Sequence, residues 1–126
     1  MYQSLTLFQT AEAVARHAGA RQALTAQNVA NADTPGYRAR QMPSFQDIAD
    51  QPAPSAMKQT RPGHQVAGDL RFAARIAEAS SEPSPNGNAV SLEEEMLNAI
   101  EIGREHNRAL TIYRHTMTVL RTTLGR

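Results

Sequence analysis

The sequence predicts an all-α fold in which two long terminal helices pair like a coiled coil and an extended linker joins them. Apolar residues recur with helical periodicity through residues 3–32 and again through 91–124, whereas residues 39–90 contain six of the seven prolines. At 1.5 Å per residue the helices would be about 45 and 50 Å long, which makes them matched partners for an antiparallel pair. We therefore divide the chain into an N-terminal segment (1–38), a Pro-rich linker (39–90) and a C-terminal segment (91–126), with the two terminal segments forming one helical core.

The first helix is predicted by an apolar stripe with the spacing i, i+4, i+7, i+11. The stripe consists of Leu7, Ala11, Val14 and Ala18, and three further residues lie beside it: Phe8, Ala15 and Val29. Nine alanines between residues 11 and 32 give high helix propensity and a slim surface that other helices can approach closely. We expect Leu7 and Val14 to contact the second helix, and Phe8 and Val29 to contact other neighbours.

A structural joint is predicted where the first helix ends, within residues 28–37. Pro35 lacks an N–H and pushes Thr34 toward extended geometry, so the helix cannot continue undisturbed. Pro-Gly at the centre of four residues favours a type II turn from Thr34 to Tyr37, with Gly36 at a positive φ. The direction of the chain is therefore set locally.

Two asparagines precede this turn on one face of the helix, because Asn28 and Asn31 are three residues apart. Their amides can satisfy carbonyls left free at the helix end, or they can bond to a neighbouring chain. A turn with no further role remains the alternative, since Asn, Asp, Thr, Pro and Gly are ordinary helix-stop residues.

The linker shows no sustained helical or strand period. Only residues 69–79 could form a short helix. The linker carries too little apolar surface to offset the entropy of ordering it, so we expect an isolated chain to leave this segment without regular structure.

The second helix begins with a predicted capping box. Ser91 can accept a hydrogen bond from the backbone N–H of Glu94, and the Glu94 side chain can reach back to Ser91. A line with a seven-residue repeat follows: Met96, Gly103, Leu110, Met117 and Leu124, with Ala99, Tyr113 and Leu120 in a companion line that His106 interrupts. Glutamates occupy the first half of the helix and arginines the second, as the helix dipole favours.

These patterns predict which side chains form interfaces. For the helix pair and subunit contacts we expect Leu7, Val14, Met96, Ile100, Leu110, Tyr113, Met117, Leu120 and Leu124. Four residues lie off that seam and form a second stripe: Phe8, Val29, Ile112 and Val119. Exposed apolar stripes usually mark an interaction surface, so we expect other subunits to complete the core. The alternative is that the linker folds over them.

Composition argues against catalysis and metal binding. The chain has no cysteine, which excludes disulfides, thiolate catalysis and cysteine-containing metal sites. None of the four histidines has a partner at metal-binding helical spacing, and the sequence has no nucleophile-elbow, Walker or dinucleotide motif. The acidic run at residues 93–95 is explained by the helix dipole. We therefore expect no enzyme activity, no cofactor and no metal.

Charge and hydropathy exclude two further classes. The formal charge of +1 is spread evenly along the chain, so there is no basic patch for nucleic acid. No apolar run approaches the roughly 18 to 20 residues that span a bilayer, and the N-terminus lacks the regions of a cleavable secretory signal. These residues alone therefore favour a cytosolic protein without direct bilayer insertion.

The order of the joint residues resembles the signature of the bacterial flagellar rod and hook proteins. The matching positions are Asn28, Ala30, Asn31, Thr34, Pro35, Gly36 and Tyr37. Residues 86–96 resemble the segment that opens the C-terminal helix in the FlgB family of proximal rod subunits, with Asn86 and Ser91 where aspartate is usual. A weaker similarity involves Thr60 and His64 in the linker. Residues 105–108 depart from the pattern, which keeps the FlgC paralogues open as an alternative.

This resemblance implies a structural subunit of the flagellar basal-body proximal rod that assembles helically and transmits motor torque. The implied partners are other rod subunits, further copies of itself, and the junction with the membrane ring and export gate. It also implies export through the flagellar type III apparatus without a cleaved signal. A soluble coiled-coil adaptor or export chaperone is the alternative from another class, and it should purify as a helical dimer instead of a mostly unstructured monomer.

Overall fold

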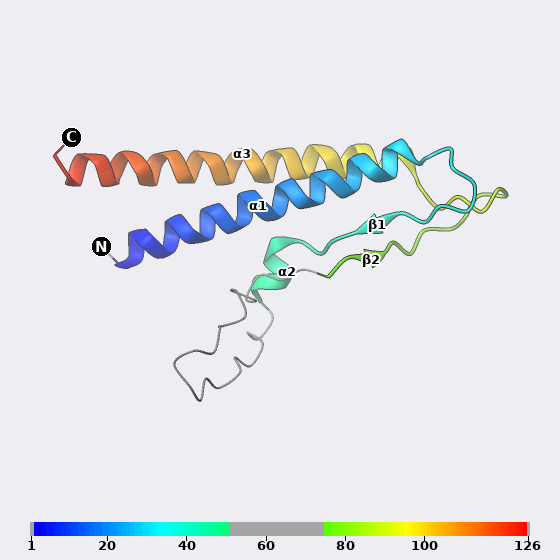
Figure 1. The fold of residues 1–126 in the computed structure, drawn as a ribbon, viewed down its shortest axis with the longest axis horizontal. Coiled ribbons are helices and arrows are strands. Elements are labelled where there is room, and N and C mark those ends of the chain that lie inside the picture. The colour runs from blue at the N-terminus through cyan, green and yellow to red at the C-terminus, as the bar shows by residue number, and fades with distance from the viewer. Residues whose placement is uncertain (1, 51–74, 126) are drawn as a thin grey trace, which may run out of the picture.

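The computed structural model describes residues 2–50 and 75–125, and it confirms the predicted fold class. The elements, in chain order, are α1 (Tyr2–Ala30), β1 (Arg40–Gln41), α2 (Phe45–Ala49), β2 (Ala77–Glu78) and α3 (Leu92–Thr123). Helices α1 and α3 run antiparallel, so the two ends of the chain lie at the same end of the molecule (Figure 1). Both helices match the predicted ranges to within two residues.

The centre of contact between the two helices, here called the helix seam, is lined by small and polar side chains and by Ile102. Four buried residues of α1 form one side: Ala11, Ala18, Thr25 and Asn28. Four buried residues of α3, spaced seven apart, form the other: Glu95, Ile102, Ala109 and Thr116. Alanines at the centre let the two backbones approach closely, which leaves larger side chains at the edges of the contact.

The predicted line of α3 is therefore wrong by one residue. Met96 follows the buried Glu95 and is 59% exposed, and Leu124 at the other end is 74% exposed. Leu110 and Met117 are half-buried at the edge of the seam. In the companion line Ala99, Tyr113 and Leu120 are likewise half-buried.

Phe8 is a second correction. It was expected to contact another subunit, but its ring lies against that of Tyr113 with centroids 4.5 Å apart. The ring pair closes the part of the seam near the chain ends, where α1 otherwise presents alanine and valine. An ion pair between Arg21 and Glu105, with 3.0 Å between nitrogen and oxygen, links the two helices nearer their middle.

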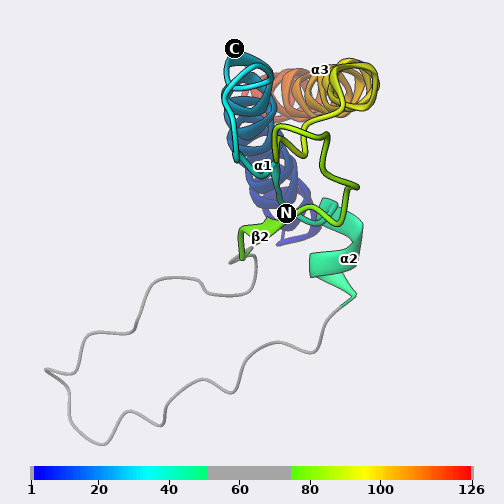
Figure 2. The same cartoon turned by 90° about the vertical axis from the view of Figure 1, so that its right-hand side faces the viewer.

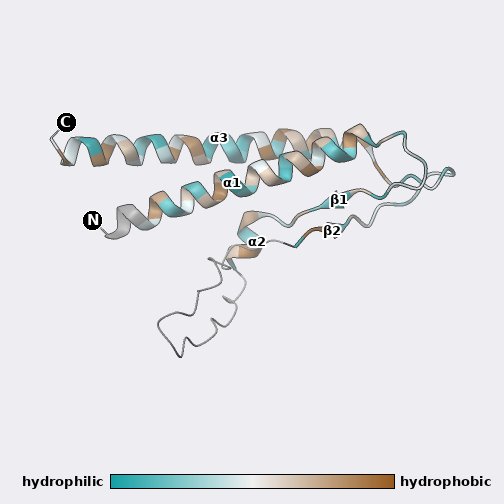
Figure 3. Cartoon of the chain, in the orientation of Figure 1, coloured by the Kyte–Doolittle hydropathy of each residue, from teal (hydrophilic) through white to brown (hydrophobic). Residues whose placement is uncertain are grey.

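Several predicted interface residues remain exposed in the single chain. From the first set these are Leu7, Met96, Ile100 and Leu124; from the second they are Val29, Ile112 and Val119. Figure 3 shows apolar positions along the whole length of α3, beyond those that α1 covers. In the single chain these exposed residues therefore do not join the helix pair.

A small second layer lies on one side of the helix pair (Figure 2). Its sheet pairs β1 and β2 antiparallel, with Arg40 opposite Glu78. Helix α2 begins with a complete capping box between Ser44 and Asp47 and buries Phe45 and Ile48. The sequence predicted none of these short elements.

The short helix expected within residues 69–79 is corrected in part. Residues 77–78 form strand β2, which the carbonyl of Ala39 extends by accepting a 2.8 Å hydrogen bond from the N–H of Ala79. Residues 75, 76 and 79 have no regular structure, and residues 69–74, together with Thr60 and His64, lie outside the described residues. No described helix is both long and apolar enough to cross a bilayer.

Candidate functional site: the interlocked joint

The turn that follows α1 has the predicted geometry. Gly36 has a φ of +71°, and the N–H of Tyr37 donates to the carbonyl of Thr34 at 3.3 Å. A Cβ added at Gly36 would meet nothing within 4 Å, so the requirement for glycine there is conformational and not steric.

Asn28 is the most buried polar residue of this region, with 1% of its surface exposed. Its amide nitrogen donates to the carbonyl of Arg40 at 2.8 Å and to Glu95 Oε1 at 2.9 Å. Its amide oxygen accepts from the N–H of Arg40 at 2.9 Å and from the Tyr37 hydroxyl at 3.3 Å. All four hydrogen-bonding positions of the amide are thereby used. Asn28 therefore serves β1 as a neighbouring strand would, and it connects α1, β1 and α3.

Asn88, in the segment 86–96 that opens α3, makes a similar connection back to the end of α1, and it is 3% exposed. Its amide nitrogen donates to the carbonyls of Asn31 at 2.9 Å and Thr34 at 2.7 Å. Its amide oxygen accepts from the N–H of Val90 at 2.8 Å. Both carbonyls lie in the turn after α1 and also accept backbone N–H groups, from Thr34 at 3.0 Å and Tyr37 at 3.3 Å. Asn88 therefore ties this turn to a distant part of the chain.

The two turns also touch through their backbones. Gly87 has a φ of +81°, and a Cβ added there would lie 3.4 Å from the Cα of Gly36. The N–H of Gly36 donates to the carbonyl of Asn86 at 3.2 Å, and the N–H of Ala89 donates to the carbonyl of Tyr37 at 2.9 Å. We call this arrangement of residues 28–40 and 86–95 the interlocked joint.

Asn31 has a more local role than Asn28. Its amide nitrogen donates to the carbonyl of Gln27 at 2.8 Å, as expected for a residue that satisfies a helix end. Its amide oxygen accepts from the Thr34 hydroxyl at 3.2 Å. Ala30 is exposed at the last position of α1.

The cap of α3 has only half of the predicted box. Ser91 accepts from the N–H of Glu94 at 3.4 Å, but its hydroxyl donates to the carboxylate of Glu93, not of Glu94. Glu94 is exposed.

Glu95 and Asn88 are the two joint residues that the sequence analysis did not assign. Glu95 is buried in the helix seam, and within the described residues its Oε2 has no hydrogen-bond partner. Its position seven residues before Ile102 was the available signal for Glu95. Asn88 lies within the motif at residues 86–96, but no local sequence pattern indicates which residues it binds.

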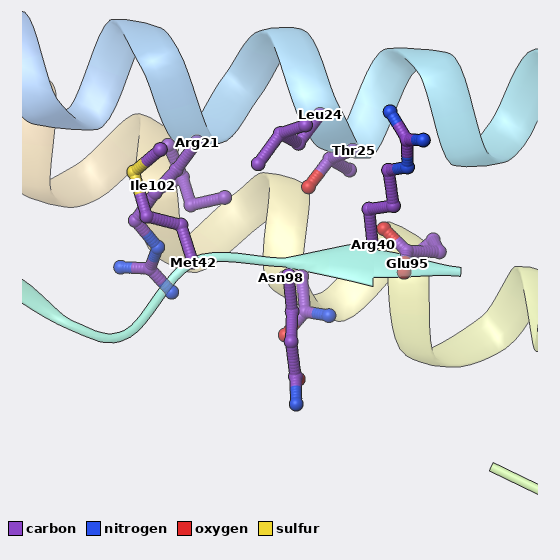
Figure 4. Close-up of a pocket in the computed structure, with 9 residues that line it drawn as sticks. Arg21, Leu24, Thr25, Arg40, Met42, Glu95, Asn98 and Ile102 are labelled. Carbon is purple, nitrogen blue, oxygen red and sulfur yellow. The ribbon is translucent and has the colours of Figure 1, made fainter. Parts of the chain in front are cut away.

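A small cavity lies beside Glu95, between α1, β1 and α3 (Figure 4). It has a volume of about 60 Å³, and it is lined by Arg21, Leu24, Thr25, Arg40, Gln41, Met42, Glu95, Asn98 and Ile102. That is room for a few water molecules and well below the roughly 300 Å³ or more of a ligand pocket. Among the described residues no cluster of three His, Cys, Asp or Glu side chains could hold a metal ion. A second, open hollow of about 660 Å³ lies at the start of α3, where Ser81, Ser91 and Glu94 are among the residues that line it. The hydrogen bonds of the joint hold chain segments together.

His17 lies under α2 and is the titratable group most affected by the fold. Its ring is buried and meets that of Phe45 edge-on, with centroids 5.8 Å apart. Neither ring nitrogen makes a full hydrogen bond within the described chain. Burial lowers the pKa of His17 below the usual 6.5, and Arg21 lowers it further. Glu105 and the carbonyl of Pro43 act in the opposite direction with smaller effect.

Acid should therefore loosen the contact between α1 and α2. Folded His17 binds its proton less readily than the unfolded chain does, so stability falls as the pH drops below 6.5 toward the lowered pKa. We expect His17→Leu to remove this dependence and to stabilise the neutral-pH fold by about 1 kcal/mol, because two unpaired buried nitrogens are lost. Circular dichroism of the purified chain between about pH 8 and pH 5 measures the helix content. The exposed His115→Leu is the control, and a parent whose helix content is unchanged over this range would contradict the expectation.

Comparisons with known proteins agree with the motifs. Residues 9–38, which contain most of α1 and the first half of the joint, match the family described as "Flagella basal body rod protein". The whole chain is similar to the flagellar basal body rod protein FlgB of Agrobacterium fabrum (strain C58). The two are 30% identical over 125 residues, which cover 94% of this chain and 93% of that protein.

Proposed function

Because the chain belongs to the flagellar basal-body rod protein family, we propose that it is a subunit of the proximal rod that assembles helically with other rod proteins and transmits motor torque. A structural role in the basal body rod follows from the family. We assign the chain no catalytic, cofactor-binding or metal-binding role. The similarity to a FlgB protein over nearly the full length supports the proximal subunit over the FlgC paralogue.

The interlocked joint carries this proposal. It fixes the N-terminal and C-terminal segments to each other with hydrogen bonds that are almost entirely buried, through Asn28 and Asn88. A buried amide whose hydrogen-bonding groups are paired, as those of Asn28 are, resists rearrangement, because other arrangements leave polar groups without partners. Glu95 Oε2 is the one group of this network that lacks a partner within the described residues. A rigid subunit is what a shaft under torsion needs, since compliant joints would absorb the rotation.

The unfilled edges of the helix seam support assembly. On one side Ile112 and Val119 are 39% and 42% exposed, and on the other Met96 and Leu124 are more exposed still. One neighbouring helix cannot cover both edges of α3, so α1 leaves room for helices from at least two directions. Side chains that interdigitate among several helices have no space to slide, which resists torsion.

The partners that we propose are other rod subunits, further copies of this chain, and the junction of the membrane ring with the export gate. The proposed location is the periplasm-spanning rod, reached by export without a cleaved signal. A cytoplasmic coiled-coil adaptor or export chaperone is less well supported, because the apolar edges of α3 lie on two sides of its seam and one dimer partner would cover only one.

Replacing Ile112 by aspartate should block rod assembly while leaving the single chain intact. Ile112 is already partly exposed, so the chain tolerates the change, but a carboxylate buried against a neighbouring helix costs several kcal/mol. We expect cells to export the variant yet form no rod and not swim, with Thr111→Asp, one residue away and exposed, as the control. Motility assays and electron microscopy of basal bodies measure the outcome. Complete rods in a strain that lacks this chain would refute the proposed function.

Substitutions at the turn should also affect assembly more than export. In left-handed geometry a β-branched residue is a strong outlier, so Gly36→Val should cost about 2 kcal/mol or more. Gly36→Asn should cost little and Pro35→Ala about 1 kcal/mol. Swimming should be impaired most in the Gly36→Val strain, less in Pro35→Ala and least in Gly36→Asn, while the amount of exported subunit stays nearly unchanged in all three. Parental motility of the Gly36→Val strain would show that the turn does not orient subunit contacts.

A further inference from the structure

The outward surface of α3 is divided by charge along its length. The exposed acids Glu93, Glu94 and Glu101 lie in its first third, and the exposed bases Arg104, Arg108, Arg114 and Arg121 follow them. Within the described residues none of these seven groups takes part in an ion pair.

The charged residues of α1 do not neutralise the exposed charges of α3. Its acid Glu12 pairs with Arg16 on its own exposed face, and its remaining base, Arg21, pairs with Glu105 in the seam. Along α3 itself about 15 residues separate the centres of the two charge groups, which is roughly 22 Å and more than two Debye lengths at physiological salt. Each charge group therefore faces solvent without a partner in the chain.

Apolar side chains accompany both charge groups. In the acidic part Met96, Leu97 and Ile100 are 59%, 63% and 52% exposed, and in the basic part Ile112 and Val119 are 39% and 42% exposed. A partner surface that matches the acidic part must thus be basic and apolar, and a second copy of α3 offers that combination in its own later half.

We propose that the acidic first part of α3 in one copy of this chain docks against the basic second part of α3 in another copy. The apolar residues supply buried area, and the charges select the register, because a like-charged alignment of the two helices brings acids onto acids and bases onto bases. Isolated surface ion pairs contribute little, so the charges act mainly by excluding wrong alignments. This inference rests on the proposed function as an assembling subunit, and it names the surface through which two copies would meet.

Single cysteines can trap this contact, because the chain has none of its own. Leu97→Cys and Thr118→Cys lie on exposed positions of the acidic and basic parts. In a mixture of the two purified variants at low salt under mild oxidation, we expect the 97–118 disulfide to exceed the 97–97 disulfide at least tenfold. A mixture at the highest soluble concentration in which 97–118 does not exceed 97–97 would overturn the contact.

Charge reversal distinguishes electrostatic register from chance collision. Reversing the acids (Glu93→Arg, Glu94→Arg, Glu101→Arg) or the bases (Arg108→Glu, Arg114→Glu, Arg121→Glu) alone should reduce the 97–118 product at least tenfold, whereas reversing both in one chain should restore it. Swapping the paired Glu12 and Arg16 on α1 is the control and should change nothing. Trapping that is insensitive to the single reversals would refute the register.

The same cysteines in cells separate this inference from the proposed function. If basal bodies contain the chain but yield no 97–118 disulfide, the contact is wrong and the rod role stands. If basal bodies do not contain the chain, the proposed function itself fails.

Discussion

Asn28→Asp should prevent the joint from closing, although the change replaces only one NH₂ group by oxygen. The new carboxylate would face Glu95 Oε1 and the carbonyl of Arg40, which now accept from the amide at 2.9 Å and 2.8 Å. Two attractive contacts become repulsive around a side chain that is 1% exposed. We therefore expect the folding stability of the subunit to fall by at least about 3 kcal/mol. The subunit should still be exported, but basal bodies should lack rods, as judged by electron microscopy and immunoblotting.

Two further variants test whether the effect arises from this network. Glu95→Gln added to Asn28→Asp supplies a donor to the new carboxylate and should recover part of the loss, as a double-mutant cycle measures. Asn31→Asp, in the same motif, should cost about 1 kcal/mol because its contacts are local and its side chain is half-buried. Equal effects of Asn28→Asp and Asn31→Asp would show that the buried network is not what holds the joint.

The second large effect is expected at Asn88. In Asn88→Asp both hydrogen bonds to the carbonyls of Asn31 and Thr34 become oxygen–oxygen contacts, and the turn after α1 loses its side-chain link to the second segment of the joint. We expect folding stability to fall by about 3 kcal/mol and rod assembly to fail. Amide exchange should be accelerated at residues 28–37.

Asn86→Asp, two residues earlier, is a matched control for the same chemical change. Asn86 Oδ1 accepts from the N–H of Asn88 at 2.9 Å, and a carboxylate oxygen can do the same. Asn86 is also exposed, so its substitution should be nearly neutral. If the two aspartate variants assemble equally well, the Asn88 side chain is not what holds the turn after α1 in place.

The parts of the fold that depend on local chemistry could be predicted from the sequence. The helices follow from apolar periodicity, and the positive φ of Gly36 follows from the Pro-Gly pair. Of the predicted stripe of α1, Ala11 and Ala18 are buried in the seam, Val14 is half-buried and Leu7 is exposed.

The missed features depend on partners that are distant in sequence. Hydrophobic periodicity predicts that a charged residue such as Glu95 faces solvent. Its burial in the seam depends on the hydrogen bond from Asn28, which lies 67 residues away in the sequence. Strands of two residues, such as β1 and β2, are too short to show a period. Phe8 was misplaced because a ring reaches across the edge of a helix to Tyr113, beyond what spacing along one helix reveals.

The joint also determines when this molecule can fold. Its decisive bonds connect the first third of the chain to the last third, with separations of 67 residues for Asn28 to Glu95 and 54 for Thr34 to Asn88. A chain that emerges N-terminus first therefore lacks one partner of each of these bonds until residue 88 or 95 of its 126 residues has emerged. Long-range contacts delay folding in this way because the loop must close before any of them can form. The joint, and the rigidity that its hydrogen bonds give, can therefore form only late in the emergence of the chain.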